Sequence, residues 1–220
     1  GGSNPTGLTA DGVTNNMAVN MLGHVLLVDE LLSKNKISGK AATVIYSGSE
    51  SARGIPQMSL EPPKLKTGSV EEFMSICDGS FFPDGAGNDP KYVGAFAKFI
   101  GALWMSSMAR KTPHVRFVTI SPGATKGTAI RRDLPCHKRL FVGTLLNILS
   151  CCGQAHSLQV GANRYVDALL EHSTYNSGVF YGSRKGLSGE VIDQADFLSY
   201  FSNEIFQDNA NEAIHKFIKK

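Results

Sequence analysis

The cysteines and a neighbouring histidine are the residues of this chain whose types and spacing could bind a metal ion. Cys136 is followed directly by His137, and the adjacent pair Cys151 and Cys152 comes further along the chain. Thiolate and imidazole groups are the ligands that zinc prefers in proteins. Adjacent cysteines rarely both bind one ion, however, and no Cys-x-x-Cys pair occurs, so we predict no metal site.

Glycines are the second set, because a Gly-rich turn between a strand and a helix can hold the pyrophosphate of a dinucleotide. Gly85 and Gly87 lie in a loop with Asp and Pro, and no predicted strand precedes them. The glycines from Gly182 to Gly189 open no evident strand-helix unit. The sequence contains no recognisable phosphate-binding turn, so we expect the chain by itself to bind a dinucleotide weakly or not at all.

Composition describes a folded protein and excludes several classes of partner. The 220 residues are 42% hydrophobic and 19% charged, enough for one domain with a substantial core. The net charge is +3 and the Lys and Arg residues are scattered, which argues against nucleic acid. Four cysteines without a disulfide pattern favour a reducing compartment, the cytoplasm or an organelle interior. The longest apolar run, residues 140–152, is shorter than the ~20 residues of a spanning helix, so we predict no transmembrane segment.

Hydrophobic periodicity divides the chain into helices and strands that alternate. The predicted helices cover residues 17–32, 92–110, 158–170 and 205–220, and the predicted strands cover 41–46, 115–120 and 178–181. Residues 50–90, between the first strand and the second long helix, are rich in Pro and Gly and form a long loop insertion. One short helix is expected inside it, with Ser69 as its N-cap and Glu72 completing a capping box.

This order of elements predicts an α/β fold, in which crossover helices cover a parallel sheet in three layers. Nothing in the sequence indicates a repeat or a second domain, so residues 1–220 are expected to form a single domain. The predicted sheet is small, and the strand at residues 41–46 has one edge without a predicted neighbour. We therefore expect another polypeptide, or a further part of the same one, to cover this edge.

Several segments resemble the short-chain dehydrogenase/reductase family, particularly its retinol-dehydrogenase and protochlorophyllide-reductase-like branch. They are Leu8–Gly12 with Asn20–His24, Val44–Ser49, the helix segment Ala97–Ala109, and Ile120–Gly123. The resemblance covers residues 1 to 182 and implies a Rossmann-like fold, of which this chain is the C-terminal portion. Gly1 and Gly2 look like the end of the strand that follows the family's Gly-rich nucleotide-binding segment, so we expect the domain to be incomplete at its N-terminus.

The resemblance implies an NADP- or NAD-linked reaction on a small apolar carbonyl or alcohol. In the family, a tyrosine hydroxyl with an ordinary pKa near ~10 acts as acid/base because a nearby lysine favours its phenolate form. By position, Ser49 matches the serine that polarises the substrate oxygen, and Asn20 matches the asparagine that maintains the proton path. Tyr92 and Lys98 are the candidates for the tyrosine and the lysine.

The resemblance also implies which residues contact the cofactor. Pro122 and Gly123 would lie over the nicotinamide, Lys98 would face its ribose, and Thr125 and Thr128 are the candidates for the family's next threonine. A Pro-Gly pair at the end of a strand is also common as a plain turn, so this assignment has an alternative without a cofactor.

The spacing of Tyr92 and Lys98 departs from the family pattern. The family's pair lies four residues apart, which brings both side chains to one side of a helix at ~3.6 residues per turn. Here the pair lies six residues apart, so the side chains are separated by roughly 120° around the helix. If Lys98 is the family lysine, Gly94 stands at the tyrosine position; if Tyr92 is the family tyrosine, Phe96 stands at the lysine position. We favour the first register, because the second would expose Trp104.

Two functions from different classes stay open. The first is a carbonyl/alcohol oxidoreductase, which Ser49 and Asn20 favour. The second is a catalytically silent relative, a pseudoenzyme that serves as a structural or regulatory subunit of a larger assembly, which the broken Tyr-Lys pair and the absent phosphate turn favour. A fold alone does not decide between them.

Overall fold

The described part of the chain folds around one four-stranded sheet. The computed structural model describes residues 7–39, 42–82, 90–128, 144 and 153–218. Its strands are β1 (Thr43–Ser47), β2 (Arg116–Ile120), β3 (Phe180–Lys185) and β4 (Ser188–Asp193), in the spatial order β1-β2-β3-β4. β1 pairs parallel with β2 and β2 pairs parallel with β3, whereas β4 is antiparallel to β3.

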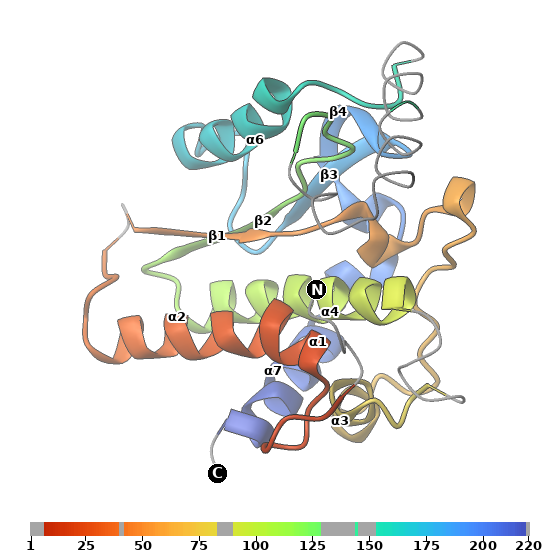
Figure 1. Cartoon of the computed structure of the whole chain (residues 1–220). Helices are drawn as coiled ribbons and strands as arrows, with labels where there is room; N and C mark the ends of the chain where they lie inside the picture. The colour runs from red at the N-terminus through yellow and green to blue at the C-terminus, as the bar shows by residue number, and fades with distance from the viewer. Residues whose placement is uncertain (1–6, 40–41, 83–89, 129–143, 145–152, 219–220) are drawn as a thin grey trace.

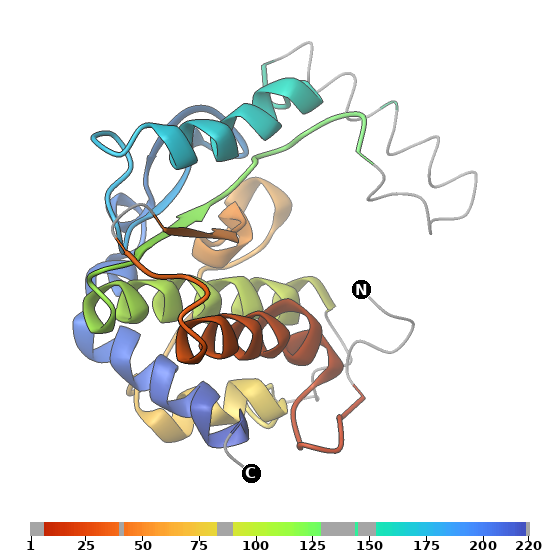
Figure 2. The ribbon, with the colours of Figure 1, turned by 90° about the vertical axis from the view of Figure 1, so that its left-hand side faces the viewer.

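Helices cover both faces of this sheet (Figures 1 and 2). They are α1 (Asn15–Met17), the π-helical turn η1 (Ala18–Leu22), α2 (Gly23–Ser33), α3 (Val70–Asp78), α4 (Pro90–Lys111), α6 (Leu158–Leu170) and α7 (Glu204–Ile218). α6 lies on one face, α2 and α4 lie on the other, and α3 and α7 form a further layer beyond them. The fold therefore has four layers. They are α6, the sheet, α2 with α4, and α3 with α7.

The α/β class and the mostly parallel sheet are confirmed, but the expectation of three strands in an all-parallel sheet was wrong. The element that was missed is β4, whose sequence Ser-Gly-Glu-Val-Ile-Asp carries too few apolar residues for a strand signal. Its sequence signal lies in the turn instead. Gly186 and Leu187 are the two residues between β3 and β4, and Gly186 adopts a positive φ of 53°, as tight hairpins require.

The long segment after β1 contains more regular structure than expected. It holds the 3₁₀ turns η2 (Glu50–Arg53) and η3 (Pro56–Met58) as well as α3. Ser69 caps α3 as predicted, since its Oγ accepts from the Glu72 amide at 3.3 Å. The Glu72 carboxylate accepts from the amides of Lys66, Thr67 and Gly68. The glutamate thus fastens the preceding loop to the start of the helix.

Most of the buried apolar side chains lie between the sheet and its helices α2 and α4, and α4 forms the centre. Its fully buried side chains include Phe96, Phe99, Ile100, Leu103 and Trp104. Trp104 is only 1% exposed. The cluster beneath α6 is much smaller and includes Val118, Ile120 and Tyr181. α4 is therefore the principal support of the sheet.

Candidate functional site

The candidate catalytic residues gather near the carboxyl end of the parallel strands, where α/β proteins commonly bind ligands. Ser49 follows β1 and Pro122 follows β2. Lys98 lies on α4 beneath β1, and Asn20 lies in the π-helical turn η1. The described structure thus brings these elements together, and the side-chain contacts decide what they can do.

Ser49 is held within its own turn. Its side chain caps η2, because Ser49 Oγ accepts from the Ser51 amide at 3.2 Å and from the Ser51 hydroxyl at 2.9 Å. The Ser49 side chain is half-buried. Its own hydroxyl proton has no role in these two bonds, so it can still donate to another group.

Asn20 has its polar groups in contact with neighbouring residues. Its amide nitrogen donates to Asn16 O at 3.1 Å and to Asn16 Oδ1 at 3.2 Å. Its main-chain carbonyl, at the π-helical turn, accepts from Tyr46 Oη at 2.8 Å. Tyr46 is buried, and burial raises the pKa of its hydroxyl, so this group stays protonated and acts as a donor. The carbonyl that a π turn makes available is therefore already engaged by a tyrosine of β1.

Lys98 points to β1. Its Nζ donates to the main-chain oxygen of Ser47 at 2.9 Å and lies 5.0 Å from the centre of the Tyr46 ring. Burial lowers the pKa of the Lys98 amine. The amine thus donates a hydrogen bond to the last residue of β1.

Tyr92 lies on the same helix as Lys98 but in different surroundings. α4 begins at Pro90, so both residues belong to one helical register. The Tyr92 ring packs against Phe82 and Phe96, with ring centres 6.0 and 5.0 Å apart. The Tyr92 ring thus lies in an aromatic cluster, whereas the Lys98 amine lies at the end of β1.

Gly94 lies between Tyr92 and Lys98 on α4. A Cβ built on Gly94 would lie 3.8 Å from Nδ2 of Asn16, the residue that bonds Asn20. Gly94, one helical turn before Lys98, therefore faces the neighbourhood of Asn20 and leaves room for a side chain there.

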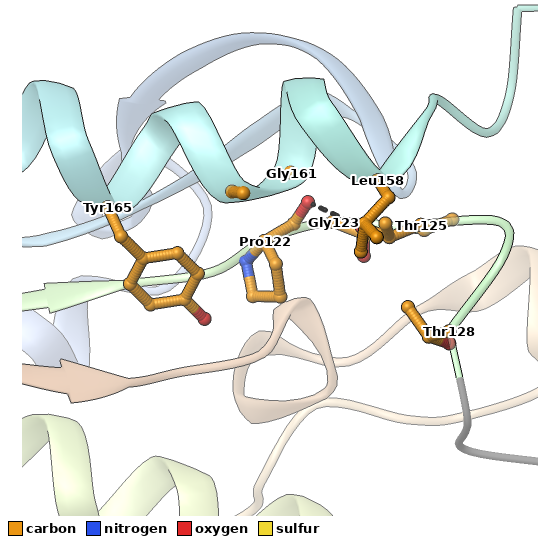
Figure 3. A pocket seen from close by; sticks show the side chains of 9 residues that line it. Pro122, Gly123, Thr125, Thr128, Leu158, Gly161 and Tyr165 are labelled. Atoms are coloured by element: carbon orange, nitrogen blue, oxygen red, sulfur yellow. Dashed lines mark hydrogen bonds between the residues drawn. The ribbon is translucent and has the colours of Figure 1, made fainter.

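Four of the five residues predicted to lie beside the cofactor share one cavity. Pro122, Gly123, Thr125 and Thr128 line a hollow of about 530 Å³ beneath α6, as Figure 3 shows. The other lining residues are Ala124, Leu158, Gly161, Ala162 and Tyr165. Tyr165 Oη bonds Ser47 Oγ at 2.7 Å and so joins this wall to the end of β1. Lys98 is not among the lining residues.

The donors of this turn do not fit the pyrophosphate of a dinucleotide. Gly123 N donates to Ser121 Oγ, Ala124 N donates to Leu187 O, and Lys126 N donates to His156 O. Thr125 Oγ1 lies 3.2 Å from the carbonyl oxygens of Pro122 and Gly123 and donates to them. Every described lining side chain is uncharged. The cavity can hold an uncharged group, but its polar hydrogens are directed into the protein.

Gly123 is required at this turn for two reasons. Its φ is +69°, which glycine adopts at little cost. A Cβ at this position would come within 2.7 Å of His156 Cε1. His156 in turn donates from Nε2 to Pro122 O at 2.6 Å, and burial lowers the pKa of its imidazole. The Pro122–Gly123 pair therefore has a structural role as a turn, whether or not it also contacts a ligand.

A buried polar network behind the cavity was missed by sequence reasoning. Glu50 is 2% exposed, and its carboxylate accepts from Ser121 Oγ at 2.5 Å and from Ser183 N at 2.9 Å. Arg164 of α6 is 4% exposed, lies 3.7 Å from Glu50, and donates to Ser121 O and Ser183 Oγ. No local sequence signal marks these residues, because their partners are distant in the chain. The network fixes the Ser49 turn, the Pro122 turn and α6 relative to one another.

Three further observations bear on function. No known family model matches the chain, and no curated protein is significantly similar to it. Among the described residues, no cluster of His, Cys, Asp and Glu could hold a metal ion, and the candidates Cys136, His137, Cys151 and Cys152 lie outside the described residues. The described helices include none with both the length and the apolar composition needed to cross a bilayer.

Proposed function

We propose that this chain is a catalytically silent relative of the short-chain dehydrogenases/reductases, acting as a structural or regulatory subunit of a larger assembly. The observation that carries the proposal is the separation of the tyrosine and the lysine. Tyr92 packs among phenylalanines, whereas the Lys98 amine bonds the Ser47 carbonyl. A lysine in that position does not favour the phenolate of Tyr92, so the acid/base pair is not formed.

Two other contacts support the same conclusion. Asn20 is the residue that the resemblance places on the proton path, and its main-chain carbonyl accepts from Tyr46. The amides of Gly123, Ala124 and Lys126 already donate to acceptors of the protein itself. None of the described strands pairs with the outer edge of β1, and a second polypeptide seated there would make the chain a subunit.

The alternative is an NADP- or NAD-linked oxidoreductase for a small apolar carbonyl or alcohol. One observation favours it: Gly94 faces Asn16, which bonds Asn20, and leaves room for a side chain one helical turn before Lys98. On this reading another hydroxyl would supply the missing acid.

The decisive experiment is a turnover assay on a complete, cofactor-competent version of the domain, because the 220-residue chain by itself is expected to bind dinucleotide weakly under either function. We expect no oxidation of NADH or NADPH with apolar aldehydes or ketones. Turnover that Tyr92→Phe abolishes would overturn the proposal, and turnover that Lys98→Met alone abolishes would favour the alternative with a different acid.

A further inference from the structure

We infer that His215 and Asp29 form a pH-sensitive clasp between the helices α7 and α2. The clasp is closed while the His215 imidazole is doubly protonated, and it opens when the ring loses a proton. Neither residue belongs to the candidate site, so the clasp is independent of the proposed absence of catalysis.

Both ring nitrogens of His215 face hydrogen-bond acceptors. Nδ1 lies 2.6 Å from the main-chain oxygen of Asn211, one turn earlier on α7, and Nε2 lies 3.0 Å from Asp29 Oδ2. A carbonyl oxygen and a carboxylate oxygen only accept, so each contact needs an N–H from the ring. A neutral imidazole has one N–H, whereas an imidazolium has two. The two contacts together therefore identify the ring in the folded protein as the charged, doubly protonated form.

The position of the ring favours this charge. His215 lies in the last turn of α7, where main-chain carbonyls without helical partners attract a cation. The side chains of His215 and Asp29 are 18% and 34% exposed, so water and salt screen the pair only in part. A carboxylate in direct contact stabilises the imidazolium and raises the pKa of the ring above the ordinary histidine value.

Further charged groups from the helices around α7 lie near this corner. They are Arg110 and Lys111 from α4, Glu71 from α3, and Asp208, Glu212 and Lys216 from α7 itself. Asp208 pairs with Arg110 at 2.7 Å. Glu212 pairs with Lys216 at 3.2 Å, and Glu71 also interacts with this lysine. Asp29 is therefore the carboxylate that compensates the His215 imidazolium directly.

The helix α7 is incompletely sealed where the clasp lies. Its buried apolar side chains, which include Ile214 and Phe217, belong to the main core. Both clasp residues, in contrast, line a cavity of about 510 Å³ between α2, α4 and α7. Asn211 also lines this cavity and is 7% exposed, and in the part of the chain that the structure describes its Oδ1 has no hydrogen-bond partner. Water would satisfy this oxygen if α7 moved away from α2, so the ion pair opposes an opening that the buried amide favours.

Loss of one proton turns the Nε2 contact from attractive to repulsive. If Nδ1 keeps its proton for the Asn211 carbonyl, Nε2 presents a lone pair to the Asp29 carboxylate. The folded protein binds the proton of the ring more tightly than the unfolded chain does. The stabilisation is therefore fully present below the ordinary histidine pKa near ~6.5, and it is lost as the pH rises through the higher pKa of the folded state.

The main test is the titration of the His215 imidazole in the 220-residue chain, followed by nitrogen-15 NMR of the ring. We expect a midpoint above about pH 7, with both ring nitrogens protonated below it. Asp29→Asn keeps the size of the side chain and offers an amide that can donate to a neutral ring, so the midpoint should fall by about one pH unit. His172, whose Nε2 bonds the Leu169 carbonyl, is the internal control and should keep its midpoint in this variant.

A second measurement distinguishes a clasp from a histidine that is merely charged. Hydrogen exchange of the α7 amides is compared between the unaltered chain and Asp29→Asn at the same pH, so that the intrinsic exchange rates cancel. At about pH 6 the last two turns of α7 should exchange about fivefold faster in the variant, and at about pH 9 the two chains should exchange alike. Glu30→Gln is the matched control on α2, because Glu30 pairs with Lys34 instead, and it should leave α7 unchanged at both pH values. A His215 midpoint that Asp29→Asn leaves in place, or equal α7 exchange in the two chains at the lower pH, overturns the inference.

Discussion

At the scale of single residues, the buried carboxylate of Glu50 is the most constrained polar group of the site. It accepts from Ser121 and Ser183 and faces the guanidinium of Arg164 at 3.7 Å. A buried charge without its counter-charge is costly, since neither water nor another ion compensates it. The pair therefore stabilises the fold only while both partners are present.

We predict that Glu50→Gln lowers the free energy of unfolding by about 3 kcal/mol. The variant leaves Arg164 charged and turns an amide N–H toward groups that now donate to Glu50. Urea denaturation measures the change. Glu190→Gln is the control, because Glu190 pairs with Arg184 at the surface and its loss should cost less than about 1 kcal/mol. Equal losses in the two variants would contradict this account of Glu50.

The Tyr46 hydroxyl gives a second prediction at this scale. It donates to Asn20 O, the carbonyl at the π-helical turn. Tyr46→Phe removes this donor to the Asn20 carbonyl, so the free energy of unfolding should fall by about 1 kcal/mol. Tyr200→Phe is the matched control, since no hydrogen bond from the Tyr200 hydroxyl is found in the described structure. If both variants unfold at the same urea concentration, the hydrogen bond from Tyr46 to Asn20 does not stabilise the fold.

At the scale of elements, two glycines of α4 have opposite surroundings. A Cβ on Gly94 would make an ordinary contact of 3.8 Å, whereas a Cβ on Gly101 would come within 2.5 Å of the Tyr46 ring. Because alanine favours a helix over glycine by about 1 kcal/mol, Gly94→Ala should stabilise the protein by up to that amount. Gly101→Ala should destabilise it through overpacking. Thermal unfolding of the two variants measures both signs, and shifts of the same sign would contradict this view of the helix.

The same elements show what the sequence could and could not predict. The periodicity predicted α6 at residues 158–170, where it lies, because its N-cap Ser157 and its apolar spacing are local signals. It did not predict β4, which carries few apolar residues and pairs with the adjacent strand β3. In the site, the spacing of Tyr92 and Lys98 indicated their register on one helix, and their function stays a prediction. The Glu50–Arg164 pair and the Tyr46–Asn20 bond join residues far apart in sequence, so no local pattern could indicate them.

At the scale of the whole molecule, the two faces of the sheet are supported unequally. On one face, α4 is buried along most of its length by α2, α7 and the sheet. On the other face, α6 rests on a small apolar cluster and on the bonds of Arg164 and Tyr165. It exposes the large apolar side chains of Leu158, which lines the cavity, and of Val160, Val166, Leu169 and Leu170. The attachment of α6 to the sheet therefore depends on polar contacts, whereas the attachment of α4 depends on apolar packing.

This asymmetry predicts where the molecule opens first. Segments with few buried apolar contacts unfold locally at a lower free energy than the central core. In hydrogen exchange followed by mass spectrometry, the amides of α6 should therefore exchange about tenfold or more faster than those of α4. Glu50→Gln should accelerate exchange in α6 further, because Arg164 is the polar link between this helix and the ends of β2 and β3. In this variant, the amides of α4 should still exchange more slowly than those of α6. If α6 and α4 exchange together in the unaltered chain, the two faces belong to one cooperative unit and the dependence of α6 on its polar contacts is wrong.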